Sequence, residues 1–141
     1  MSLKVLLVDS DWYFLNQATN ILESRGHHVL QEPDPAEAIE RARRWRPDVA
    51  MVDVRLPGVH QGKLLAHLAS IQPRPAIVLL SALEDFEKAW QAWQRGGDDV
   101  LFKPILHPAD VHLAILTARK NALCPQRRPA TAQPRPVARS A

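Results

Sequence analysis

Four side chains that could take part in phosphate chemistry each follow directly on an apolar stretch. They are two carboxylates, a hydroxyl and an amine, namely Asp9, Asp53, Ser81 and Lys103. The preceding stretches are VLLV (5–8), VAMV (49–52), VLL (78–80) and VLF (100–102). One such residue could be chance, but four at corresponding positions indicate a shared site.

Together these groups are suited to moving a phosphoryl group onto a carboxylate. An aspartate can attack phosphorus and form an acyl phosphate. Neighbouring carboxylates can hold Mg²⁺, which prefers oxygen ligands and neutralises the approaching anions. A lysine stabilises phosphoryl oxygens as a point charge, and a hydroxyl can donate a hydrogen bond to them.

The elements that must position these residues follow from hydrophobic periodicity. Continuous apolar runs predict strands buried on both faces, near residues 5–8, 27–30, 49–52, 76–80 and 99–102. Helical spacing of apolar residues predicts helices near 14–22, 38–45, 64–69, 86–93 and 111–118. This alternation predicts an α/β fold, a flavodoxin-like doubly wound (βα)5 with parallel strands in the order 2-1-3-4-5. In such a sheet, ligands bind at the carboxyl ends of the strands.

Helix ends carry recognisable signals as well. Asp34-Pro35 and His107-Pro108 predict helix starts, and Gly26 and Gly96 predict helix ends. The pair Asp98 and Asp99 is interpreted as turn residues.

Composition predicts a single domain with a tail. The chain has 141 residues, one cysteine (Cys124) and a formal net charge of +3. Residues 124–141 contain four arginines, four prolines and no acid, so we expect a disordered tail or linker after a domain at 1–123. The basic stretch 41–47 is interpreted as a solvated helix face, and no direct binding of nucleic acid by the domain is expected.

Targeting signals are not evident in the sequence. No apolar run approaches the roughly 18–20 residues of a membrane span, so no membrane partner is expected. The start, MSLKVLLVDSD, lacks the pattern of a secretory signal. With a single cysteine, these features favour a cytoplasmic location.

The ordered set LLVDSD (6–11), PDVAMVDVRLPG (47–58), VLLSA (78–82) and GGDDVLFKP (96–104) resembles the receiver domain of two-component response regulators. The resemblance covers about residues 3–122. It implies that Asp53 is the phosphoacceptor, and that Mg²⁺ is bound by Asp9, Asp53 and the Arg55 carbonyl. Ser81, Ala82 and Lys103 would contact the phosphate, and the bond between Lys103 and Pro104 would be cis.

The same resemblance implies a regulator rather than an enzyme. A histidine kinase or histidine phosphotransfer protein would supply the phosphoryl group. The modified domain would then contact a downstream protein through the face formed by its fourth helix, fifth strand and fifth helix.

Departures from the family pattern concern the metal and the switch. Ser10 stands where the family usually has a second acid, so Mg²⁺ should bind more weakly. Asp11 either assists the metal or caps the first helix. Val100 stands where an aromatic residue is usual, and Arg55 and Leu83 occupy positions that tune dephosphorylation in the family.

Two other functions are compatible with parts of the sequence. Ser10 and Val100 motivate a receiver-like docking module that works without phosphorylation. The DxD pattern of Asp9 and Asp11 also begins phosphatases of the haloacid dehalogenase type, with Asp9 as nucleophile and Asp11 as acid and base. That interpretation leaves Asp53 without a role.

Overall fold

The computed structural model of the protein describes residues 1–123. The predicted tail, residues 124–141, lies outside the described residues, and the boundary at 123 stays a prediction. The elements in chain order are β1 (Lys4–Val8), α1 (Trp12–Ser24), β2 (His28–Glu32), α2 (Pro35–Trp45), β3 (Val49–Asp53), α3 (Lys63–Ala69), β4 (Ala76–Ala82), the 3-10 helix η1 (Leu83–Asp85), α4 (Phe86–Gln94), β5 (Asp99–Lys103) and α5 (Pro108–Leu123).

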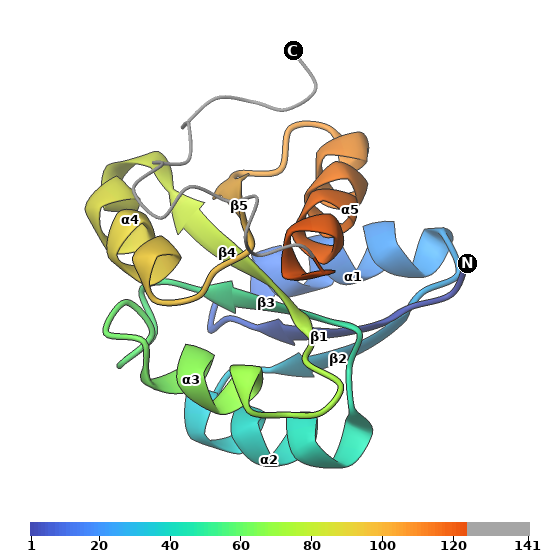
Figure 1. Ribbon diagram of the computed structural model, residues 1–141. Helices are drawn as coiled ribbons and strands as arrows, with labels where there is room; N and C mark the ends of the chain where they lie inside the picture. The colour runs from blue at the N-terminus through green and yellow to red at the C-terminus, as the bar shows by residue number, and fades with distance from the viewer. Residues whose placement is uncertain (124–141) are drawn as a thin grey trace.

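The five strands form one parallel sheet in the order β2-β1-β3-β4-β5, which confirms the predicted fold. Figure 1 shows helices covering both faces of this sheet. Helices α1 and α5 pack on one face, and α2, α3 and α4 pack on the other. Because both faces are covered, the strands are apolar almost throughout, which explains the continuous runs in the sequence.

Side chains that alternate along each strand separate the core into two layers. Along β1, Val5 and Leu7 point toward α1 and α5, whereas Leu6 and Val8 belong to the opposite layer. Trp93 is buried in that opposite layer and Trp90 packs against it from α4. These two tryptophans therefore pack helix α4 against the sheet.

The predicted helix ends agree with the structure. The Asp34 carboxylate accepts a hydrogen bond from the Ala36 N–H, and Pro35 is the first residue of α2. Gly26 follows α1 with a φ of 85°, in the left-handed region that favours glycine. Helix α2 instead ends at Arg46, a non-glycine residue with a φ of 53°, which the sequence pattern does not indicate.

Of the two residues interpreted as turn residues, Asp98 lies in the bend before β5, but the interpretation is wrong for Asp99. Asp99 is the first residue of β5, and both residues are buried. Asp98 forms an ion pair with Arg74, whose Nη1 lies 2.8 Å from Asp98 Oδ2, and it accepts a hydrogen bond from the Ile77 N–H. These contacts satisfy the Asp98 carboxylate at the amino end of the sheet.

Within residues 1–123, no helix combines the length and the apolar character needed to cross a membrane.

Candidate functional site

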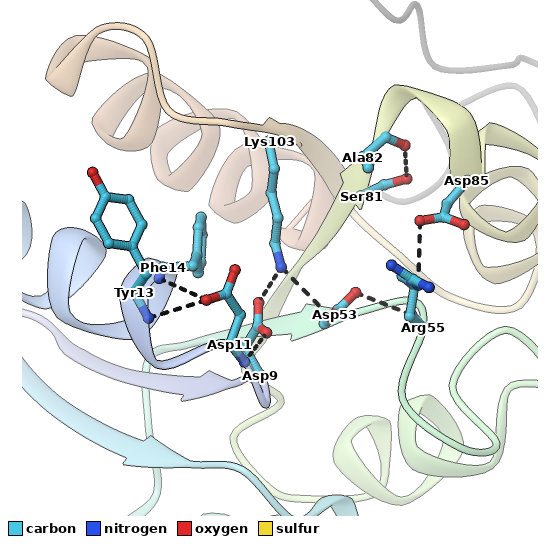
Figure 2. Close-up of polar contacts among 10 residues, drawn as sticks. All are labelled: Asp9, Asp11, Tyr13, Phe14, Asp53, Arg55, Ser81, Ala82, Asp85 and Lys103. Carbon is cyan, nitrogen blue, oxygen red and sulfur yellow. Dashed lines mark hydrogen bonds and ion pairs between the residues drawn. The ribbon is translucent and has the colours of Figure 1, made fainter.

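Carboxylates from two neighbouring strands meet an amine from a third at the carboxyl end of the sheet. Asp9 directly follows β1, and Asp53 is the last residue of β3, its neighbour in the sheet. Lys103 is the last residue of β5. Its Nζ lies 2.6 Å from Asp9 Oδ2 and 3.5 Å from Asp53 Oδ2 (Figure 2). Three of the four side chains expected to share a site therefore converge.

Asp9 lies at the floor of this arrangement. Its side chain is fully buried, and its Oδ1 accepts a hydrogen bond from the Asp11 N–H. Burial raises the pKa of Asp9 above the ordinary 3.8, and the negative charge of Asp53 acts in the same direction. The Lys103 contact and the Asp11 N–H oppose this rise in pKa. Burial and the Asp53 charge therefore disfavour the charged form of Asp9, and the Lys103 contact partly offsets them.

Asp53 is the carboxylate that faces the accessible space. It lines an open cleft of about 280 Å³ together with Ser10, Asp11, Arg55, Ala82 and Lys103. Its Oδ1 accepts a hydrogen bond from the Arg55 N–H at 3.0 Å. This bond and the lysine hold the carboxylate at the base of the cleft (Figure 2).

The Ser81 hydroxyl is not hydrogen-bonded to Asp53. Its hydroxyl donates to the Ala82 carbonyl at 2.7 Å, and its side chain is fully buried (Figure 2). Ala82, not Ser81, lines the cleft. A hydrogen bond from Ser81 to a ligand in the cleft would require the hydroxyl to leave the carbonyl.

Asp11 caps the first helix, which is one of the two roles expected for it. Its Oδ1 accepts hydrogen bonds from the N–H groups of Tyr13 and Phe14, so Asp11 caps helix α1. It also lines the cleft, as does the exposed Ser10. Asp11 can therefore offer its second carboxylate oxygen to the cleft without releasing the helix.

Comparison with known proteins identifies the family. The model of the response regulator receiver domain matches residues 5–116. The chain belongs to this family. Residues of this receiver domain are also 34% identical over 100 residues to the probable transcriptional regulatory protein TcrX of Mycobacterium tuberculosis. That match covers 71% of this chain and 43% of TcrX, so the chain spans less than half of that relative.

Solved structures share the receiver fold. NtrX from Brucella abortus superposes with a TM-score of 0.77 at 23% identity, covering 90% of this chain and 28% of NtrX. The receiver domain of the sensor histidine kinase PA1611 from Pseudomonas aeruginosa superposes with a TM-score of 0.73 at 23% identity, covering 85% of this chain and 99% of that one. The PA1611 structure has a magnesium ion coordinated in its active site cleft.

The oxygen donors of this receiver domain fit Mg²⁺, although few of them are charged carboxylates. The described residues 1–123 contain no group of three or more His, Cys, Asp or Glu side chains placed to hold a metal. Asp9 and Asp53 nevertheless both contact the Lys103 amine, and Ser10 lines the same cleft as Asp53. Mg²⁺ is commonly bound through one or two carboxylates, with water and phosphate completing the shell.

Two contacts of the site could not be read from the motifs. The Lys103 Nζ lies 4.6 Å from the centre of the Phe14 ring, a cation–π contact that orients the lysine. The Arg55 side chain reaches the start of α4, where its Nε lies 3.6 Å from Asp85 Oδ2 (Figure 2). Asp85 carries no sequence signal beyond its place after β4, so only the fold reveals this pair.

Proposed function

We propose that this receiver domain is phosphorylated on Asp53 by a histidine kinase or a histidine phosphotransfer protein. The observation that carries the proposal is the Asp53 carboxylate itself, which lines the base of an open cleft 3.5 Å from the Lys103 amine. Asp9 is the less suitable nucleophile, because it is fully buried and does not line the cleft.

The transfer is a substitution at phosphorus. An Asp53 oxygen forms a bond to phosphorus while the P–N bond of the phosphohistidine breaks, and the electron pair of that bond remains on the imidazole nitrogen. Lys103 offsets the charge on the phosphoryl oxygens. The Arg55 N–H, which already donates to Asp53 Oδ1, keeps the carboxylate oriented during the attack.

Asp9, Asp53 and the carbonyl of Arg55 would hold Mg²⁺, with Ser10 and Asp11 at the edge of the ion. Bound there, the ion would neutralise charge between the carboxylates and the phosphoryl oxygens. We place the reaction in the cytoplasm, where a chain with a single cysteine needs no disulfide. Output would pass to a downstream protein through the α4-β5-α5 face.

Incubation with acetyl phosphate and Mg²⁺ tests the proposal by intact mass. The wild-type protein should gain roughly 80 Da, the mass of one phosphoryl group. Asp53→Asn should gain nothing, because an amide cannot form the acyl phosphate, and circular dichroism should show that it remains folded. Glu23→Gln is the control and should be labelled like the wild type, since it removes an exposed carboxylate outside the cleft.

Other outcomes would assign the cleft differently. Labelling that persists in Asp53→Asn would contradict the acceptor assignment. Absence of labelling in the wild type, together with no binding of beryllofluoride, would favour the phosphorylation-independent docking module. Labelling of Asp9 with continuous release of phosphate would favour a phosphatase.

Ser10→Asp should strengthen Mg²⁺ binding. A carboxylate in place of the Ser10 hydroxyl adds a charged oxygen donor to the wall of the cleft. We expect the dissociation constant for Mg²⁺ to fall about tenfold, roughly 1.4 kcal/mol, measured by isothermal titration calorimetry. Ser10→Asn adds a side chain of similar size without the charge and should change affinity much less. Equal effects of the two substitutions would indicate that charge at this position does not limit metal binding.

A further inference from the structure

An ion pair connects the loop after the proposed acceptor to the start of helix α4. Arg55 lies two residues after Asp53, and its Nε is 3.6 Å from Asp85 Oδ2. Asp85 is the residue immediately before α4, yet its side chain makes no capping hydrogen bond to that helix. The carboxylate is thus directed to Arg55 rather than to the helix that it precedes (Figure 2).

This pair is weak enough to be exchanged. The Arg55 side chain is 64% exposed while that of Asp85 is 14% exposed. An ion pair with one well-exposed partner and a single contact of this length changes an equilibrium by only about two- to fivefold, because water screens the charge and the long side chain loses freedom. A better partner for Arg55 would therefore draw it away from Asp85.

A phosphoryl group on Asp53 would be such a partner. Arg55 and Asp53 line the same cleft, so the exposed Arg55 side chain starts from the wall of the space that the group would enter. A guanidinium can bind phosphoryl oxygens with two parallel hydrogen bonds, a geometry that its single Nε contact with Asp85 does not provide. Lys103, the other cation lining the cleft, is already in contact with both Asp9 and Asp53.

Two other side chains that could connect Asp53 with α4 are poorly placed to do so in this chain. The Ser81 hydroxyl is directed to the Ala82 carbonyl. Val100 on β5 is a buried aliphatic residue and offers no large side chain that could rearrange beside α4. Arg55 remains as a charged side chain that both lines the cleft and contacts the residue at the start of α4.

We propose that the Arg55 side chain is a phosphoryl-binding residue that exchanges Asp85 for the phosphoryl oxygens and thereby releases the start of α4. The inference rests on the proposed phosphorylation of Asp53 and specifies how that event would reach the α4-β5-α5 face. Once released, the Asp85 carboxylate lies at the amino end of α4, where a negative charge interacts favourably with the helix dipole.

Beryllofluoride with Mg²⁺, a non-covalent mimic of the phosphoryl group, tests the exchange in the full chain. Two variants remove opposite ends of the ion pair, and binding is followed by titration. Arg55→Gln should weaken beryllofluoride binding about tenfold, because a charged donor to the ligand is lost. Asp85→Asn should instead strengthen it about threefold, because the arginine no longer has to leave a carboxylate. A merely structural ion pair would give effects of the same sign for both variants.

Amide chemical shifts provide the second readout. In the wild type, beryllofluoride should move the backbone amides of residues 84–88 at the start of α4. Arg55→Gln should move the same amides toward their ligand-bound positions without any ligand, whereas Arg55→Lys should retain a partial response. Glu23→Gln and Arg43→Gln, which change exposed charges outside the pair and outside residues 84–88, should behave as the wild type.

The outcomes separate the exchange from the function on which it rests. Binding of beryllofluoride with unchanged amides at 84–88, or affinity changes of the same sign in both variants, would overturn the exchange alone. Failure of the wild type to bind beryllofluoride at all would overturn the proposed function and the exchange together. Opposite affinity changes with the ligand-like shift in Arg55→Gln would establish both.

Discussion

Lys103→Met should lower the free energy of unfolding by about 3–4 kcal/mol at pH 7. The substitution keeps the approximate length of the side chain but leaves the fully buried Asp9 carboxylate beside Asp53 without its cation. Removing one partner of a buried ion pair typically costs about 3–5 kcal/mol. The loss has a ceiling here, because Asp9 can take up a proton instead. Protonating an ordinary carboxyl, with its pKa of 3.8, costs about 4 kcal/mol at pH 7.

Urea denaturation at two pH values measures this effect. At pH 5 the same proton uptake is easier, so the loss in Lys103→Met should shrink to less than about 2 kcal/mol. Adding Asp9→Asn to Lys103→Met should restore most of the stability, because the uncompensated charge is gone. Lys120→Met removes an exposed lysine and should change stability by no more than about 0.5 kcal/mol. A small loss in Lys103→Met that Asp9→Asn does not reverse would contradict this account of the site.

Asp9→Asn alone should stabilise the protein at neutral pH, by about 1–2 kcal/mol. Burial raises the pKa of Asp9, so the ionised form of this residue opposes folding. The amide has similar shape and no charge, and Lys103 keeps Asp53 as a partner. Residues arranged for function are commonly held at a cost in stability, and Asp9 is the member of this site with a raised pKa.

The dependence on pH gives the sign of the Asp9 effect. Because the folded pKa lies above the unfolded value of 3.8, the folded protein binds more protons than the unfolded chain between these two pKa values. The contribution of Asp9 to stability is therefore present below pH 3.8 and is lost as pH rises through the folded pKa. The advantage of Asp9→Asn over the wild type should grow from pH 4 to pH 7, measured by urea denaturation. The exposed Glu23→Gln serves as the control, and an advantage that falls with pH would contradict the raised pKa.

The fold could be predicted because its signals are local. Strands buried on both faces must be apolar throughout, so runs such as VLLV and AIVLL stand out, and their polar terminators mark the carboxyl edge of the sheet. The convergence of Asp9, Asp53 and Lys103 follows from that edge alone. No comparable signal marks the end of α2, where Arg46 adopts a left-handed conformation.

The details that escaped prediction depend on side chains that are distant in sequence. The contact between Arg55 and Asp85 requires the loop after β3 and the start of α4 to be placed relative to each other. The burial of Asp98 depends on Arg74, which a reading of the GGDD stretch as a turn does not include. The orientation of the Ser81 hydroxyl is a choice between two acceptors, which the residue type does not decide.

The Lys103 side chain extends from β5 across the ends of two strands to Asp9. The sheet order places β4 and β3 between β5, which carries the lysine, and β1, which precedes Asp9. A single side chain therefore spans three of the four strand junctions at the carboxyl edge. Any ligand at Asp53 that attracts the ammonium must lengthen its 2.6 Å contact with Asp9. A ligand bound at the end of β3 would in this way weaken the Lys103 contact at the end of β1, without movement of the backbone between the two strands.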